Sequence, residues 1–180
     1  MKRLLTLIVF SFVLFVVASS AQAQMDMLKP APELKKLDYF LGNWSLEGDM
    51  KPGAMGPGGK MTETEANKWM DGDFFLQCNV EFKSTNMGNG TGVAYMGYNS
   101  DEKVYTYDAF NSMGEAEHSK GTLDGDTWNW ASEDKMGGMK MKTHFIIKTL
   151  SPTSYTFKFD MSQDGTTWNT VMEGKATKTK

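Results

Sequence analysis

The chain has 180 residues, a formal net charge of −3 and hydrophobic side chains at 40% of its positions, which is the balance of one ordinary globular domain. The charge is mildly acidic and the lysines are scattered, which excludes the basic surfaces that bind nucleic acids or anionic membranes. A single cysteine, Cys78, excludes an intramolecular disulfide. Because Cys78 lies on the apolar face of an alternating segment, we assign it to the core.

The first 23 residues have the pattern of an export signal. Lys2 and Arg3 are followed by an apolar run over residues 4–17, and Ala21-Gln22-Ala23 provides the small residues of a cleavage site. The run is shorter than the about 20 apolar residues that span a membrane. We therefore expect residues 1–23 to be cleaved after Ala23, leaving a periplasmic or secreted protein without stable membrane insertion. Its charge would be 17 − 22 = −5, and residues 24–32 would form a flexible N-terminus.

One short helix is predicted at the start of the domain. Leu34, Leu37 and Leu41 have helical spacing within residues 32–41, and Gly42 follows at the position of a C-terminal cap. We expect this helix to act as a plug for the segments that follow it.

From residue 44 onward, apolar and polar residues alternate in short segments, and turn residues such as Asp71-Gly72 separate them. The connections are too short for crossover helices, so the sheet must be antiparallel. A barrel and a sandwich both fit evenly spaced strands, and closure into a barrel removes exposed edges. We predict an all-β fold, a single antiparallel up-and-down β-barrel of about ten strands with a short N-terminal helix. The expected strands cover residues 44–50, 61–70, 74–83, 91–98, 103–110, 115–123, 126–132, 139–150, 154–161 and 167–178.

The alternation predicts an interior that is aromatic and rich in methionine. Such a lining suits a bulky apolar or aromatic ligand, and it suits a filled core equally well. We expect a small apolar molecule to bind noncovalently, with side chains that act as walls rather than catalysts. The predicted wall residues are Trp44, Tyr107, Trp130, Met141, Phe157 and Met172. The alternative for Trp44 is a purely structural role, in which it packs the closed end of the barrel.

The opening of the first strand resembles a known family. Gly42-Asn43-Trp44-Ser45-Leu46-Glu47-Gly48 is similar to the Gly-x-Trp-x-x-Glu-Gly motif of small calycin-like barrels, a group that includes lipocalin-like and nitrobindin-type proteins. The chain is more similar still to the exported bacterial domain-of-unknown-function family 1579. The matching segments are the Gly/Pro-rich loop after the first strand and residues 71–77, 97–99 and 164–174. The resemblance implies a calycin-like barrel over residues 33–180 and implies no activity.

The nitrobindin resemblance would imply a haem held by a histidine near the final strand. Residues 167–178 contain no histidine, and the two histidines of the chain are His118 and His144. We therefore expect no haem and no other resident cofactor.

Methionine is unusually frequent, and Met136-x-x-Met139-x-Met141 has the clustered thioethers that select Cu(I). Met139 and Met141 also fit the apolar face of a strand, where methionine fills gaps in a core. The main interpretation is a protein without a metal site, and Cu(I) binding is the lesser alternative.

Catalytic residues are not expected. Glu63 and Glu65 share a strand face, as paired carboxylates do in hydrolases, and we assign them to an outward polar face. His118 lies near Glu115 and Glu117 without a nucleophile motif, so we assign it to the surface. The protein is thus predicted not to be an enzyme. The other alternative is a filled barrel that serves as an interaction module of the cell envelope, and dimerisation through an edge or rim is left open.

Overall fold

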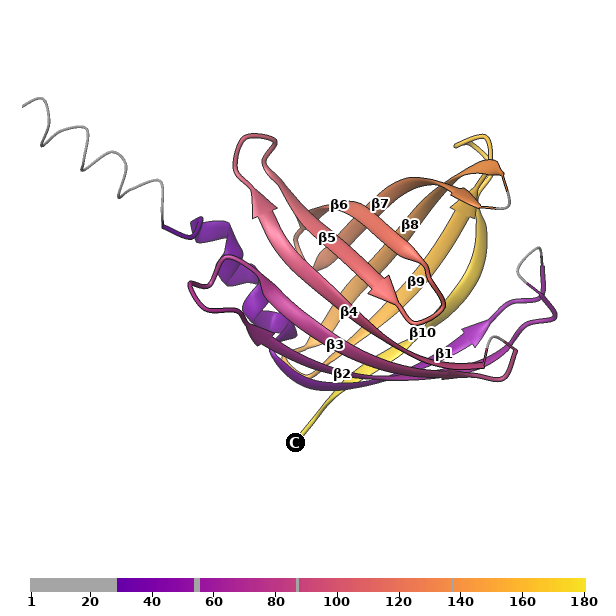
Figure 1. The fold of residues 1–180 in the computed structure, drawn as a ribbon, viewed down its shortest axis with the longest axis horizontal. Coiled ribbons are helices and arrows are strands. Elements are labelled where there is room, and N and C mark those ends of the chain that lie inside the picture. The colour runs from indigo at the N-terminus through magenta and orange to yellow at the C-terminus, as the bar shows by residue number, and fades with distance from the viewer. Residues whose placement is uncertain (1–28, 54–55, 87, 137) are drawn as a thin grey trace, which may run out of the picture. The chain divides into compact units, whose positions relative to one another are not determined.

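The computed structural model describes residues 29–53, 56–86, 88–136 and 138–180 (Figure 1). The predicted export signal and most of the expected flexible N-terminus lie outside the described residues. Residues Pro32–Lys180 form one compact unit, which contains a short helix and all the strands.

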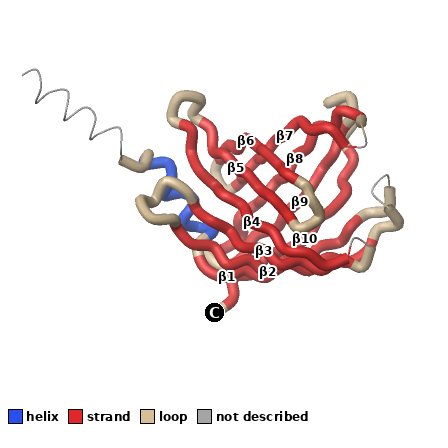
Figure 2. The backbone as a smooth tube through the Cα atoms, in the orientation of Figure 1, coloured by secondary structure: helices blue, strands red, loops and turns tan. Residues whose placement is uncertain are grey.

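The unit is a closed antiparallel β-barrel, as predicted. Each strand pairs with its neighbours in the chain, and the last strand returns to pair with the first (Figure 2). Closure therefore leaves the sheet without an unpaired edge. The ten strands are β1 (Gly42–Met50), β2 (Gly59–Trp69), β3 (Leu76–Ser84), β4 (Gly88–Asn99), β5 (Val104–Asn111), β6 (Ala116–Asp124), β7 (Thr127–Met136), β8 (Met139–Ser151), β9 (Ser154–Ser162) and β10 (Asn169–Thr179).

The connection between β2 and β3 differs from the tight Asp71-Gly72 turn that the sequence predicts. Residues 70–75 form a longer loop, in which the Met70 amide donates to the Phe75 carbonyl at 2.9 Å. Asp73 has a φ of 58° and gives the loop its extra bend. The strand consequently begins at Leu76 and leaves Phe75 exposed, whereas Cys78 is 3% exposed, in the predicted core position.

The helix η1 (Pro32–Phe40) is a 3₁₀-helix, which has three residues per turn. Its buried side chains are Leu34, Leu37 and Phe40, spaced by three, so Phe40 takes the place that the 3.6-residue period assigned to Leu41. Gly42 follows with a φ of 90°, a conformation that glycine adopts without strain, and there the chain turns into β1.

Hydrogen bonds fasten η1 across one end of the barrel, where Figure 1 shows it. The Tyr39 hydroxyl donates to the carbonyls of Ser151 and Ser154 at 3.0 and 2.9 Å, and the Tyr105 hydroxyl donates to the Glu33 carbonyl at 3.2 Å. Further bonds to η1 come from Trp44, Asn67, Trp69 and Lys178. Because the donors and acceptors come from strands all round the barrel, η1 closes this end as the expected plug.

Trp44 is the centre of the aromatic packing beneath this plug. Its side chain is 1% exposed, its Nε1 donates to the Phe40 carbonyl at 2.8 Å, and its ring lies 5.0 Å from that of Tyr155. Lys178 places its Nζ 5.0 Å from the same ring, a cation–π distance. Trp44 therefore belongs to the core of the closed end.

The first and last strands approach each other closely at two facing glycines. Gly48 pairs with Gly174, and the tip of the Phe157 ring lies against both of them from inside the barrel. A Cβ on Gly174 would overlap the Glu47 carbonyl oxygen and the Phe157 ring. These glycines therefore give Phe157 its position in the interior.

In the part of the chain that the structure describes, no helix has the length and apolar character of a membrane span.

Gly174→Ala should lower the free energy of unfolding by about 2 kcal/mol, because a backbone carbonyl cannot move away as a flexible side chain can. Urea unfolding followed by circular dichroism measures the change. Gly53→Ala is the matched control, since a Cβ there meets nothing within 4 Å. Equal effects of the two substitutions would contradict the close approach as the cause.

Candidate functional site

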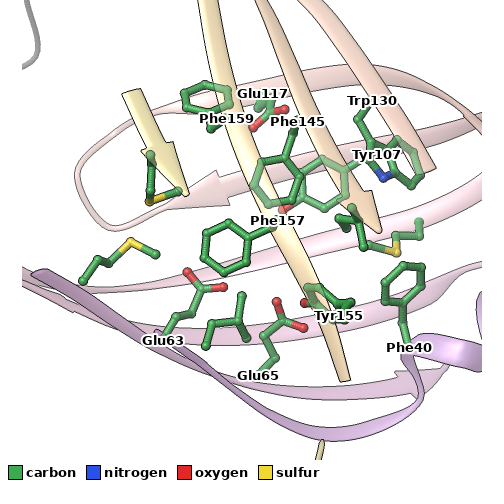
Figure 3. Close-up of a pocket in the computed structure, with 15 residues that line it drawn as sticks. Phe40, Glu63, Glu65, Tyr107, Glu117, Trp130, Phe145, Tyr155, Phe157 and Phe159 are labelled. Carbon is green, nitrogen blue, oxygen red and sulfur yellow. The ribbon is translucent and has the colours of Figure 1, made fainter. Parts of the chain in front are cut away.

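The interior of the barrel holds a cavity of about 240 Å³ next to the η1 plug (Figure 3). Its walls are aromatic rings, methionines and aliphatic side chains, interrupted by three carboxyl groups. The lining residues are Phe40, Leu46, Met61, Glu63, Glu65, Met96, Tyr107, Glu117, Trp130, Phe145, Ile147, Tyr155, Phe157, Phe159 and Met172.

A second hollow of about 710 Å³ continues from the cavity toward the opposite end of the barrel. The two spaces share Glu63, Tyr107, Glu117 and Phe159 as lining residues, so they are contiguous. The outer hollow is lined by strand ends and by residues of the β5–β6 turn, such as Gly114. A ligand thus has a route to the cavity from the end that η1 does not close.

Four of the six predicted wall residues line the cavity: Tyr107, Trp130, Phe157 and Met172. Trp44 lies in the core of the closed end instead, separated from the cavity by its packing against Tyr155 and Phe40. Met141 is half-buried on β8, two residues nearer the rim than Thr143, which lines the outer hollow. The sequence left open to which face of the sheet Tyr107 points. In the structure it points inward, and its ring centroid lies 5.8 Å from that of Trp130.

The assignment of Glu63 and Glu65 to an outward face is wrong. In the register of the barrel Glu63 pairs with Leu46 of β1, and Glu65 pairs with Trp44. Residues directly opposite each other on neighbouring strands point to the same face of a sheet. Because Leu46 and Trp44 point inward, the two carboxyl groups must also point inward, and Figure 3 shows both projecting into the cavity.

The two carboxyl groups share a hydrogen bond, and its effect on the two pKa values is opposite. Burial, the neighbouring Glu65 charge and this bond raise the pKa of Glu63 to about 8. Burial also raises the pKa of Glu65, while hydrogen bonds from Asn67 and Glu63 oppose that rise. Glu63 is therefore the protonated partner that donates to Glu65.

Asn67 connects this pair to the plug. Its Nδ2 donates to Glu65 Oε2 at 2.7 Å and to the Phe40 carbonyl at 3.1 Å. Asn67 is 5% exposed, and its Oδ1 is buried without a hydrogen-bond partner among the described residues. The amide thus fixes the Glu65 carboxyl group relative to the end of η1.

Glu117 enters the cavity from β6, although its sequence position suggested it only as a neighbour of His118. It pairs with Ala109 of β5, and it accepts a hydrogen bond from the buried Ser119 hydroxyl. Burial raises its pKa. His118 is exposed and hydrogen-bonded to Asp108 at 2.6 Å. Because neighbouring residues of a strand point to opposite faces, the assignment of His118 to the surface already implied that Glu117 points inward.

Two tyrosines add hydroxyl groups to the cavity. Burial raises the pKa of Tyr107 and of Tyr155 well above the ordinary value, and the nearby glutamates raise both further. The Tyr107 side chain is half-buried among the cavity-lining residues, and within the described residues its hydroxyl makes no hydrogen bond.

The described residues contain no group of three His, Cys, Asp or Glu side chains that could hold a metal ion. For the methionine alternative, Met139 is 55% exposed and Met141 half-buried, and the side chain of Met136 lies outside the described residues. His144 stacks on Trp168 with ring centroids 3.7 Å apart, away from the cavity residues. Cu(I) binding stays a prediction.

The chain matches the family model described as "Protein of unknown function (DUF1579)" over residues 29–178, so it belongs to that family, and the predicted resemblance is confirmed. No curated protein matches the chain significantly.

Among solved structures, the "Crystal Structure of Rv2717c from M. tuberculosis" is 13% identical with a TM-score of 0.57, covering 84% of this chain and 100% of that one. A de novo designed fluorescence-activating β-barrel is 13% identical with a TM-score of 0.45, and EF1p2_mFAP2b bound to DFHBI is 10% identical with a TM-score of 0.43. Each of these two comparisons covers 79% of this chain and 95% of the other. At such identities the mycobacterial structure shows a shared fold and nothing further.

The titration of the glutamate pair should make stability depend on pH. The pKa of Glu63 is about 8 in the folded protein, and its ordinary value is 4.5. Between these two pH values the folded protein keeps a proton that the unfolded chain has released. The free energy of unfolding should therefore fall as the pH rises from about 5 to about 8. Glu63→Gln, which mimics the protonated acid, should be more stable than the wild type at about pH 8 by on the order of 2 kcal/mol and similar at about pH 5.

Urea unfolding at several pH values measures this difference. Glu81→Gln is the matched control, because Glu81 is exposed on the outer face of β3. A stability gain for Glu63→Gln that does not depend on pH would contradict the assignment of the proton.

Proposed function

We propose that this member of the DUF1579 family binds a small, largely apolar or aromatic molecule noncovalently inside the barrel, without changing it chemically. The observation that carries the proposal is the cavity of about 240 Å³ inside the barrel. It favours a ligand-binding barrel over the alternative of a barrel filled by its own side chains. Protein interiors are otherwise packed about as densely as organic crystals.

The cavity is contiguous with the outer hollow, so a ligand can reach its largely apolar walls and gain van der Waals contact with them. Together with the outer hollow, the space falls in the range of about 300–1,000 Å³ that is typical of small-molecule sites.

The walls suit a flat or aromatic ligand. Trp128 and Trp130 stack with their ring planes 5° apart, and Phe145 stacks on Phe157 at a centroid distance of 5.7 Å. Rings held by such packing lose little conformational freedom when a ligand arrives, so binding requires little reorganisation.

The site of action is part of the proposal. The leader over residues 1–23 has the features of a cleaved export signal, so the barrel would meet its ligand in the periplasm or outside the cell. Neither a nucleic acid nor a membrane is the proposed partner, and the proposal does not require dimerisation.

Acid–base catalysis is a second candidate function, and one observation favours it. Glu63 and Glu65 form a hydrogen-bonded pair in a cavity, and the pKa of Glu63, at about 8, lies in the range where a carboxyl group exchanges protons near neutral pH. We expect the natural ligand to be recovered unchanged after long incubation with the protein, as measured by mass spectrometry. Conversion that scales with protein concentration and disappears in Glu63→Gln would establish an enzyme instead.

Native mass spectrometry tests binding directly. The mature protein, purified from a host that exports it, should carry an extra mass that is released on denaturation. A polypeptide without extra mass, together with no uptake of the neutral apolar dye Nile red, would contradict the proposal and favour the interaction module.

Substitutions in the wall should weaken binding while the fold persists. Trp130→Ala and Phe157→Ala each remove a ring from the cavity, and each should weaken Nile red binding at least about tenfold, since truncating a buried aromatic anchor costs about 2 kcal/mol or more. Phe74→Ala is the matched control, because Phe74 is exposed in the loop of residues 70–75. Unchanged affinity in both wall variants, with native circular dichroism, would exclude the cavity as the binding site.

A further inference from the structure

The cavity is strongly unbalanced in charge. Among the described residues that line it, three are glutamates and none is Lys, Arg or His. The outer hollow has one basic lining residue, Lys135, against the acidic Asp134 and Glu115 and the glutamates Glu63 and Glu117 that it shares with the cavity. A ligand that travels inward therefore meets carboxyl groups at every depth.

The groups that face Glu63 are all acidic or neutral. They come from each side of the cavity: Glu65 on β2, Cys78 on β3, Tyr107 on β5, Glu117 on β6 and Tyr155 on β9. Burial and these glutamates raise the pKa values of the Cys78 thiol and of both tyrosines, so all three groups stay neutral. Within the described lining, the protein thus supplies no cation to pair with the glutamates.

The Tyr107 hydroxyl is a polar group of the cavity besides the carboxyl groups. The side chain is half-buried among the cavity-lining residues, and its ring lies at a tilted angle of 56° to that of Trp130. A hydroxyl both donates and accepts hydrogen bonds, so this one is available to a polar group of a bound molecule.

We propose that the ligand is an organic cation, a molecule with an amine or quaternary ammonium group on an apolar or aromatic body, whose positive nitrogen lies beside Glu63 and Glu65. This inference rests on the proposed function and names the class of ligand. The body of the ligand would pack against the rings, and the nitrogen would provide the charge that the cavity lacks.

Three physical reasons favour a cation over other ligands. Carboxylates buried without a counter-charge are costly, and an opposite charge removes most of that cost. The rings of Trp130, Phe157, Tyr107 and Tyr155 line the same space, and aromatic rings attract cations to their faces. An anionic ligand would meet like charge, and a neutral ligand would leave Glu65 without a counter-charge.

Binding of a cation should release protons. In the free protein Glu63 holds a proton up to a pKa of about 8, and a positive nitrogen next to it favours the ionised form. A permanently charged quaternary ligand does not titrate, so any dependence of its affinity on pH arises from the protein.

The test compares three probes of matched shape on the full mature chain by isothermal titration calorimetry. They are phenylbutyl-trimethylammonium, its neutral tert-butyl analogue, and phenylpentanoate as the anion. At about pH 8 the cation should bind at least about tenfold more tightly than the neutral analogue, and the anion should bind most weakly. Affinity for the cation should fall by up to about tenfold per pH unit below about pH 8, with proton release seen in buffers of different ionisation enthalpy, while the neutral analogue shows no pH dependence.

Glu63→Gln should abolish the pH dependence and lower the affinity for the cation about tenfold, with little effect on the neutral analogue. Glu81→Gln, on the outer face of β3, should change neither. Circular dichroism confirms the fold of each variant.

The outcomes separate the two proposals. Equal affinity for the cation and its neutral analogue, or tightest binding of the anion, would overturn the organic-cation inference and leave the proposed binding function standing. Absence of binding for all three probes, with no extra mass on the native protein, would overturn both. A pH dependence that persists in Glu63→Gln would also overturn the role assigned to the pair.

Discussion

The carbonyl oxygen of Phe40 links the closed end of the barrel to the candidate site. It accepts hydrogen bonds from Trp44 Nε1 at 2.8 Å and from Asn67 Nδ2 at 3.1 Å, and all three side chains are buried. The first bond holds the plug on the aromatic core, and the second orients an amide that also binds Glu65. Loss of the plug would therefore expose the aromatic core and free the amide that holds Glu65. It would also leave the Trp44 and Asn67 donors without their acceptor, which is costly for buried groups.

The cavity combines two features that each oppose stability. Its empty volume removes packing contacts, and its carboxyl groups are raised in pKa because burial disfavours their charge. The barrel tolerates both because its backbone hydrogen bonds form a closed ring from β1 to β10. A stable frame around a destabilised interior is the arrangement expected where the interior serves a function.

The architecture of the barrel was predictable from the sequence, whereas the residues that line the cavity were predictable only in part. Alternation and turn residues are local signals, and they predicted the ten strands. Helical spacing predicted the plug, and the motifs of residues 71–77, 97–99 and 164–174 indicated the family. Trp130 and Phe157 were assignable to the interior because their strands alternate apolar with polar residues. On β2 both faces are polar, as in Thr62-Glu63-Thr64-Glu65, so the sequence of that strand cannot show which face is inside. The inward direction of Glu63 and Glu65 follows only from their pairing with Leu46 and Trp44. That register cannot be read from the sequence, because the long loop between β1 and β2 does not fix which residues pair.

By itself, the sequence determined the elements of this protein, because a period of two and short turns leave an antiparallel, closed sheet as the economical solution. Only the tertiary structure decided what the inside contains. Whether a barrel is hollow depends on how side chains from strands far apart in the chain fill a shared volume, and Phe40, Phe157 and Trp130 leave a cavity there. The acidity of that cavity was likewise set by register, since a shift of one residue on β2 would turn Glu63 and Glu65 to the solvent.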